Sequence, residues 1–408
     1  MIGLIGSLAG LIKIHNSKTL VDDAVFRLHY RWTTSLCFLA CALVAASDMF
    51  GEPIQCLMNG GEAPKPYTTF CWVSSTFTIN TSNADGESGH YESYGSNYSG
   101  TGKYDSKTHE KRIHTYYQWV PFVLFALGAL FYLPHLIWKE IEGKKVECLL
   151  QGLSVISMDD AAPAKKMNIV KYLFASHGRL NNRYAYGYFF SHVLNLVVVV
   201  SAMFILESFF GGVFLDYGSK TVRYLNGHAD VAHNPLIFAF PRVAKCHFRM
   251  YGPSGSLENH DLMCLLPQNI INEKIFLFIW FWLLILTTAT AMQIVYIAAI
   301  FLSPFLRLKL LETYGRVMSD AQLEDLVHRT YLGDWFLLRT LGKNVDALTF
   351  KDIMQELVKM IAAHSSSGSR GEPVTMFSPH APSYRHFNID EEDPLEHKRR
   401  MEEEDTRV

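Results

Sequence analysis

The sequence predicts an all-α membrane protein: a subunit with four transmembrane helices, disulfide-linked extracellular loops and a helical cytoplasmic domain. Three observations lead to this fold class. The 408 residues contain four long apolar stretches, of which residues 113–138 carry no Asp, Glu, Lys or Arg. At the rise of an α-helix, such a stretch is long enough to cross a bilayer. Only 19% of the residues are charged, and four cysteines lie in two polar segments between the apolar ones. One stretch alone would also fit a buried helix of a soluble protein, and three more favour a membrane protein.

Composition limits the other classes of protein. The mean hydropathy of +0.08 is low for a membrane protein, so long polar loops or tails must accompany a small number of spans. The net charge of -2 offers no electrostatic basis for binding nucleic acid. We therefore expect no nucleic-acid partner.

The amino-terminal region, residues 1–31, begins with the apolar stretch Met1–Ile12. No positive charge precedes this stretch and no convincing cleavage site follows it, so it does not fit a signal peptide. Ile2, Ile5 and Leu8 recur at helical spacing, which predicts a short amphipathic helix. An anchor lying on the membrane surface and a segment inside a pore both remain open at this point.

The spans are predicted from apolar stretches bounded by charged or polar residues. Cys37 and Cys41 lie one turn apart in the first span and are expected to be packed thiols. Asn195 in the third either bonds a neighbouring helix or meets water, and the same alternatives hold for Thr287, Thr288, Thr290 and Gln293 in the fourth. The fourth stretch exceeds one crossing, so it tilts or projects beyond the bilayer. The four predicted spans are residues 32–50, 116–138, 184–210 and 274–305.

The second span carries the marks of two membrane interfaces. Tyr116, Tyr117 and Trp119 form an aromatic belt at its beginning, and Trp138 and Lys139 mark the other interface. Pro121 falls near the first turn, where a missing amide donor costs little. Pro134 falls in the last turns, where we expect it to kink or end the helix.

Charge and glycosylation signals predict the topology. Residues 139–183 contain eight Lys and Arg, against five in residues 48–112 and six in residues 216–274. The positive-inside rule therefore places 139–183 in the cytoplasm. The two N-glycosylation sequons, at Asn80 and Asn97, both lie in the first outer loop. Four spans then leave both termini in the cytoplasm, with residues 51–115 and 211–273 as the extracellular loops.

The outer loops contain four of the seven cysteines. Cys56 and Cys71 lie in the first loop, and Cys246 and Cys264 lie in the second. An even number in an oxidising compartment predicts two disulfides. Four cysteines allow three pairings, and their spacing does not choose among them. Cys148 is expected to be cytoplasmic and reduced.

Residues 306–363 are predicted to form a helical cytoplasmic region. A capping box begins at Ser319, and Thr349 resembles a second helix start. We expect these helices to pack with those of residues 139–183. Residues 364–408 are rich in Ser and Gly and then in charges of both signs, which predicts a disordered tail.

Motifs of enzyme chemistry are missing from the sequence. It has no HExxH, G-x-S-x-G, Walker or dinucleotide-binding pattern. His228 and His233 share a loop with Asp230, but no ligand spacing completes a zinc site. We expect no catalytic residue, metal or cofactor. The spans also lack the paired acidic and basic residues of a coupled transporter, which leaves an oligomeric pore or a structural adhesion protein.

Several motifs resemble those of the innexins, the gap-junction proteins of invertebrates, and most of all the insect members. The resemblance covers about residues 1–363. The family signature at the start of the second span is matched by Tyr116, Tyr117, Gln118, Trp119, Val120 and Pro121. Further matches are GEPIQC at 51–56, FCW at 70–72, the run from Phe240 to Trp282, GDW at 333–335 and LGKN at 341–344.

The resemblance implies a ring of subunits, eight by analogy, in the plasma membrane at cell–cell junctions. Two rings on neighbouring cells would dock through their outer loops. The partners would thus be copies of the same chain, other innexins, the docked ring and membrane lipids. The resemblance also implies the nested disulfides Cys56–Cys264 and Cys71–Cys246. The residues that it places at the narrow mouth of the pore are Met1, Ile2, Gly3, Leu4 and Ile5.

Three functions remain for this sequence. A junctional channel passes ions and small solutes passively and needs bare docking tips. A non-junctional large-pore channel, like the related vertebrate pannexins, needs only the pore, and glycans at Asn80 and Asn97 would favour it by obstructing docking. A four-span adhesion protein of the claudin type would not carry two cysteines in each outer loop or the YYQWV motif.

Overall fold

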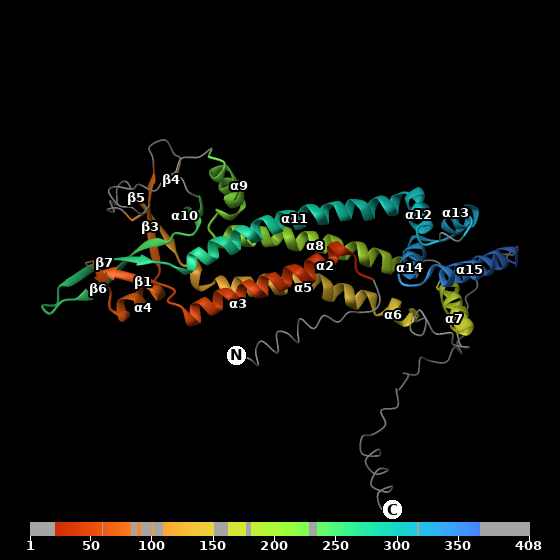
Figure 1. Ribbon diagram of the computed structural model, residues 1–408, viewed down its shortest axis with the longest axis horizontal. Helices are drawn as coiled ribbons and strands as arrows, with labels where there is room; N and C mark the ends of the chain where they lie inside the picture. The colour runs from red at the N-terminus through yellow and green to blue at the C-terminus, as the bar shows by residue number, and fades with distance from the viewer. Residues whose placement is uncertain are drawn as a thin grey trace, which may run out of the picture. The chain divides into compact units, whose positions relative to one another are not determined.

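The computed structural model describes residues 21–58, 60–82, 88–90, 100–101, 109–150, 162–176, 181–227, 235–315 and 318–367. In this part of the chain, four helices are long and apolar enough to cross a membrane, and Figure 1 shows them side by side. The predicted four-span helical fold class is confirmed. The four helices are the continuous segment Ala24–Phe50, α5 (Val120–Glu142), α8 (Asn182–Phe209) and α11 (Gln268–Leu302).

The helix of the first span begins before the residues predicted to lie in the membrane. It consists of α2 (Ala24–Arg27), the π-helical segment η1 (Leu28–Thr33) and α3 (Thr34–Phe50). Asp23 begins it as the N-cap residue, because its side chain accepts a hydrogen bond from the Phe26 amide at 2.8 Å. The sequence placed the boundary at Arg31, but a single arginine near the end of a span does not stop a helix.

The α-helix of the second span starts and ends a few residues after the predicted span, residues 116–138. Tyr116–Gln118 form the short 3₁₀ helix η2, and α5 begins only at Val120. Pro134 lies buried inside α5, and the helix continues past it to Glu142. The helix ends where Gly143 adopts a left-handed conformation with φ +57°. The fourth helix, in contrast, begins before the predicted residue 274, at Gln268. Its first turns contain polar residues, which the sequence analysis assigned to the outer loop, but these side chains are buried.

The four spans of one subunit pack as a four-helix bundle. In it α3 contacts α5, α5 contacts α8, α8 contacts α11, and α11 contacts α3. Val44, Leu124, Leu206 and Phe276 are fully buried in the shared core. Because lipid is as apolar as these side chains, close packing rather than water exclusion holds spans together. Gly128 in α5 illustrates this, since a Cβ there would stand 2.7 Å from the ring of Phe38.

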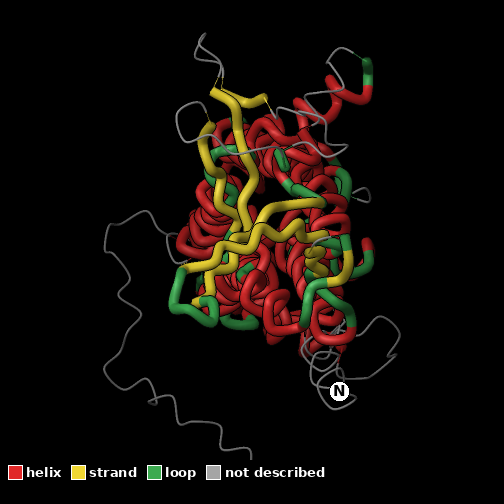
Figure 2. Tube along the Cα trace, turned by 90° about the vertical axis from the view of Figure 1, so that its left-hand side faces the viewer, coloured by secondary structure: helices red, strands yellow, loops and turns green. Residues whose placement is uncertain are grey.

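The outer loops form a seven-stranded antiparallel sheet at one end of the spans, where the sequence predicted only loops (Figures 1 and 2). The strand order is β2-β1-β7-β6-β3-β4, and β5 also pairs with β3. The longest pair, β6 with β7, forms a hairpin in register from Val243↔Leu265 to Tyr251↔Leu257. The strands are β1 (Gln55–Met58), β2 (Gly61–Glu62), β3 (Thr76–Ser82), β4 (Ser88–His90), β5 (His109–His114), β6 (Val243–Tyr251) and β7 (Leu257–Leu265).

Three shorter helices accompany the sheet. The first, α4 (Lys65–Ser74), lies between β2 and β3 and contacts β1 and β6. The other two, α9 (Phe214–Leu225) and α10 (Pro235–Ala239), follow the third span and contact each other. Helix α9 also packs against α8 and α11, so it joins the sheet-bearing end to the spans.

The helices at the opposite end connect the two remaining polar segments. Asp334 of α14 accepts a hydrogen bond from the Asn181 amide before α8 at 2.8 Å, and Lys166 pairs with Asp352 at 2.7 Å. The predicted packing between residues 139–183 and the helices after 306 is therefore present. The elements are α6 (Lys145–Leu150), α7 (Ala162–Ala175), α12 (Pro304–Glu312), α13 (Asp320–Arg329), α14 (Leu332–Gly342) and α15 (Ala347–Ser367).

Candidate functional site

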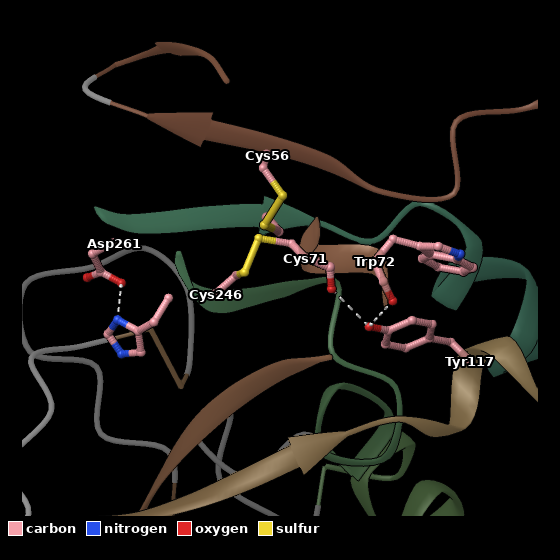
Figure 3. The surroundings of a disulfide bond; sticks show 8 residues. Cys56, Cys71, Trp72, Tyr117, Cys246 and Asp261 are labelled. Atoms are coloured by element: carbon pink, nitrogen blue, oxygen red, sulfur yellow. Dashed lines mark hydrogen bonds and ion pairs between the residues drawn. A yellow bond between two sulfur atoms is a disulfide. The ribbon is translucent and has the colours of Figure 1, made fainter. Parts of the chain in front are cut away.

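Two disulfides join the outer loops into one body (Figure 3). Cys56 on β1 and Cys264 on β7 are direct partners in the strand register, with Cα atoms 3.9 Å apart. Cys71 on α4 bonds Cys246 on β6, with Cα atoms 5.9 Å apart. These are the pairs that the resemblance implied. Each bond links the first loop to the second, so neither loop can move independently of the other.

The two disulfides lie next to each other in a small apolar core. The sulfurs of Cys56, Cys71 and Cys264 lie within 4.8 Å of one another, and all four cysteines are buried. Because every sulfur belongs to a disulfide, none is a thiolate that could ligate a metal. Ile54, Ala63, Leu262 and Leu266 complete this core. The site is therefore a structural clamp.

The signature motif ties the second span to this clamp. The Tyr117 hydroxyl donates to the carbonyl oxygens of Trp72 at 3.4 Å and Cys71 at 3.5 Å. The Tyr117 ring packs on the Trp72 indole with centroids 4.6 Å apart, and the Gln118 amide also donates to the Trp72 carbonyl. Figure 3 shows the tyrosine reaching the end of α4, one residue from the disulfide. The motif thus sets the position of α4 relative to α5.

The rest of the motif forms the boundary between sheet and spans. Tyr116 packs edge-on against Phe210 and Phe240, with centroids 5.5 and 5.8 Å apart. Trp119 is 60% exposed on the outer surface of the bundle, which fits an aromatic belt. Val120 is buried, and Pro121 stands in the first turn of α5.

Buried polar groups around the sheet are neutral or paired. The His114 imidazole lies 2.8 Å from the Thr78 hydroxyl, and burial, aided by the nearby Arg112 charge, lowers its pKa to about 3. Burial also raises the pKa of Tyr117. On the outer face, Lys245 pairs with Asp261 at 2.9 Å. The buried His114 is therefore neutral at physiological pH, and the Lys245 charge is balanced by Asp261.

The hairpin tip of β6 and β7 presents apolar side chains outward. Tyr251 is 75% exposed and Leu257 is 53% exposed, and the turn between them begins at Gly252. Large exposed apolar groups at the edge of a rigid element are typical of contact surfaces. This tip is one part of the described sheet that offers such a surface.

The polar groups of the fourth span contact other helices or their own backbone. Thr287 and Thr288 donate to carbonyl oxygens of α11 itself. Thr290 lies 2.7 Å from His29 of the first span, and the Gln293 amide donates to Asp23. Asn195 is buried in the bundle. Contacts with the first span therefore account for Thr290 and Gln293, and bonds to the backbone of α11 account for Thr287 and Thr288. The Asn195 amide nitrogen has no hydrogen-bond partner among the described residues.

Some residues named in the sequence analysis lie outside the described residues. These are the predicted site residues Met1–Ile5 and Asn97, and the group His228, Asp230 and His233, which was not predicted to bind a metal. Asn80 lies on β3 opposite Glu110. Sequence reasoning missed the contribution of Trp72, whose only sequence signal is its place in the FCW match next to Cys71.

Comparisons with known proteins identify one family and several relatives that cover most of the chain. The family profile described as Innexin matches residues 22–361. Innexin inx3 of Drosophila melanogaster is 36% identical over 365 residues, which cover 88% of this chain and 90% of the relative. Innexin inx2 of Schistocerca americana is 36% identical over 362 residues, covering 88% and 98%. Innexin shaking-B of Drosophila melanogaster is 34% identical over 377 residues, covering 91% and 99%.

Proposed function

The chain belongs to the innexin family, and from this premise we propose that it forms gap-junction channels by docking rings of its own kind through the disulfide-clamped outer sheet. Innexins are gap-junction channel subunits, so the chain is a channel protein of the plasma membrane. One observation carries the docking proposal: both disulfides cross from one outer loop to the other. A covalently fixed sheet can meet its counterpart on another cell without a cost in loop ordering.

The docking surface includes the β6–β7 tip with Tyr251 and Leu257. Two identical tips facing each other across the gap would bury these exposed apolar side chains. The ring contains eight subunits by analogy with the family, and it forms from this chain alone or with other innexins. Transport through it is passive, with no turnover chemistry.

Both termini lie in the cytoplasm in this proposal. The excess of Lys and Arg in residues 139–183 supports that orientation, and so does the placement of both disulfides at the other end of the spans. Glycosylation at Asn80 and Asn97 would follow on the first loop, whereas the β6–β7 tip proposed for docking belongs to the second loop, so docking requires that the glycans leave this tip bare. A glycosidase should then shift the mobility of the wild type, and Asn80→Gln with Asn97→Gln should abolish the shift. An amino terminus accessible from outside intact cells would contradict the orientation.

The amino-terminal residues Met1–Ile5 line the narrow mouth of the pore in this proposal. The segment is apolar, and Asp22 is the first acidic residue of the chain. The family profile begins at this residue, so the assignment rests on the resemblance and on the position of the segment ahead of the first span.

Paired cells that both express the chain test the function. Dye and current should pass between the cells, and neither should pass when one cell lacks the protein. Dye uptake by single cells without transfer between pairs would indicate a non-junctional channel. Neither signal, with the protein present at the surface, would contradict the pore itself.

A further inference from the structure

Three basic side chains gather at the end of the spans opposite the outer sheet. Arg27 is the last residue of α2, and the other two belong to the end of α14. Lys343 lies close enough to both arginines for their charges to act on its ammonium group. We call Arg27, Arg339 and Lys343 the basic cluster.

No carboxylate neutralises the basic cluster by direct contact. Among the described residues, none of its three side chains forms an ion pair with Asp or Glu. Asp22 and Asp23 attract the cluster at longer range, but their oxygens accept hydrogen bonds from side chains of the spans. Burial, followed by the Arg339 charge, lowers the pKa of Lys343, and Asp23 only partly opposes this. Cations that crowd together without a bound anion repel one another.

The basic cluster lies at the level of a membrane interface. Trp138, which marks one end of the second span, donates to Asp22 at 3.2 Å, and Arg27 follows within the first turn of the first span. Arg339 donates to the hydroxyl of Tyr296 on the fourth span at 3.3 Å. Tyrosine and tryptophan are enriched at the depth of the lipid headgroups. Cations at this depth therefore stand beside phosphate groups.

Apolar surface adjoins the basic cluster on the fourth span. Tyr296 is 39% exposed, and Met292, one turn before it on α11, is 68% exposed. Residues at this spacing are neighbours on one helix face. An acyl chain would cover this face in the membrane, where it continues the apolar surface of the span. The cations and the apolar face together match a molecule with an anionic head and a hydrocarbon chain.

We propose that the basic cluster binds the phosphate of an anionic phospholipid in the cytoplasmic leaflet, with an acyl chain along Met292 and Tyr296. The choice of leaflet rests on the proposed orientation of the chain. A guanidinium group holds phosphate oxygens by paired hydrogen bonds, and an ammonium group holds them as a point charge. Because Arg27 belongs to the first span and Lys343 to the end of α14, the bound phosphate would join these two elements.

Lys343→Gln is the variant that isolates the charge. The Lys343 side chain has no hydrogen bond or ion pair in the described part of the chain, so its neutralisation removes only repulsion from the lipid-free protein. Lys343→Arg keeps the charge. Arg339→Gln removes a second cation together with the bond to Tyr296. Arg329→Gln is the matched control, because Arg329 lies on α13 and is already paired with Asp325 at 2.7 Å.

The experiment titrates the purified full-length protein in detergent with short-chain phosphatidylserine and follows the unfolding temperature. Short-chain phosphatidylcholine provides the neutral lipid, and inorganic phosphate provides the free anion. Of the three, phosphatidylserine alone should raise the unfolding temperature of the wild type, and added salt should weaken the effect. Loss of one charge should lower the apparent affinity about fivefold in Lys343→Gln and at least as much in Arg339→Gln. Lys343→Arg and Arg329→Gln should bind as the wild type does.

Lipid-free stability provides the second readout. Lys343→Gln without lipid should unfold at the wild-type temperature or above it, because the repulsion among the cations is reduced. A lower unfolding temperature, together with a changed size of the assembly, would assign the basic cluster to a contact between subunits and overturn the proposal.

Three results of the titration would also overturn it. Equal stabilisation by phosphatidylcholine would show that charge is not recognised, and equal stabilisation by inorganic phosphate would show a site for a free anion. Wild-type affinity in both Lys343→Gln and Arg339→Gln would place the lipid elsewhere. None of these measurements requires channel activity, so a failure of dye transfer between cells would contradict the proposed function separately.

Discussion

The indole of Trp280 in α11 lies directly against Gly218 of α9. A Cβ built on Gly218 would stand 2.1 Å from Cε3 of the indole, and the indole N–H donates to the Leu215 carbonyl at 3.0 Å. The ring therefore fills the space that a side chain at Gly218 would need. This contact holds α9 against the outer end of the fourth span.

Gly218→Ala should destabilise the protein by about 1–3 kcal/mol, because a methyl group would overpack a contact that cannot yield without moving the ring. Thermal unfolding of the purified protein measures the loss. Gly61→Ala is the control, since the nearest atom to a Cβ there is 4.0 Å away. Equal unfolding temperatures for the two variants would show that α9 shifts freely.

Removal of one disulfide should abolish docking before it affects membrane insertion. Each bond typically contributes about 2–4 kcal/mol by restraining the unfolded chain, and the spans do not depend on it. Cys56→Ser leaves a free Cys264 thiol next to the second disulfide, so it should be more harmful than Cys56→Ser with Cys264→Ser. Dye transfer and surface labelling provide the two measurements. Peptides linked as Cys56–Cys71 would disprove the cross-loop pairing.

Tyr117→Phe should loosen the attachment of α4 to the second span without removing the ring contact with Trp72. The lost hydroxyl bonds are worth about 0.5–1.5 kcal/mol. Tyr117→Leu should cost more, because it also removes the ring stacking at 4.6 Å. Unfolding temperatures rank the two variants, and a Phe variant as unstable as the Leu variant would assign the whole effect to the hydroxyl.

Acidification should weaken the outer sheet through His114. Its pKa in the folded protein is about 3, below the ordinary 6.5, because burial disfavours the charged form. The unfolded chain therefore binds a proton that the folded chain does not, and stability falls as the pH drops from about 6.5 toward 3. The slope is at most about 1.4 kcal/mol per pH unit. His114→Asn should flatten this dependence in unfolding measured between pH 7 and 5, and an unchanged slope would rule out His114 as its source.

Deletion of Met1–Ile12 should alter conductance or gating while rings still form. The described contacts between spans begin at Asp22 and do not require the deleted residues. Single-channel recording and the size of the purified assembly provide the two readouts. Loss of the assembly would show that the segment builds the ring instead of lining it.

The sequence was sufficient to predict the spans, because a bilayer requires long uncharged helices and the chain has four. It did not predict the sheet. The strand pairs β1 with β7 and β3 with β6 join residues from two loops that the second and third spans separate, as Cys56↔Cys264 and Phe77↔Lys245 illustrate. Nothing local in either loop specifies such a pairing, and the half-polar β7, LENHDLMCL, does not alternate cleanly.

Two other features needed the structure for different reasons. Helix α14 is buried on nearly every side, from Gly333 to Gly342, so it has no amphipathic period to find. Asp22 and Asp23 contact side chains of three spans that are distant in the sequence. From the sequence alone, a pair of aspartates before a helix indicates only an N-cap. The disulfide pairing was available only through the family resemblance, since four cysteines allow three arrangements.

The bond between Cys56 and Cys264 closes the polypeptide on itself, because the two residues are 208 positions apart and enclose the second and third spans with the segment between them. A protease that cuts the backbone once inside this interval produces no separate fragments until the disulfides are reduced. A nicked subunit would keep its molecular mass on a non-reducing gel and its place in the ring. Damage to the segment between these spans would therefore alter the channel without dismantling it.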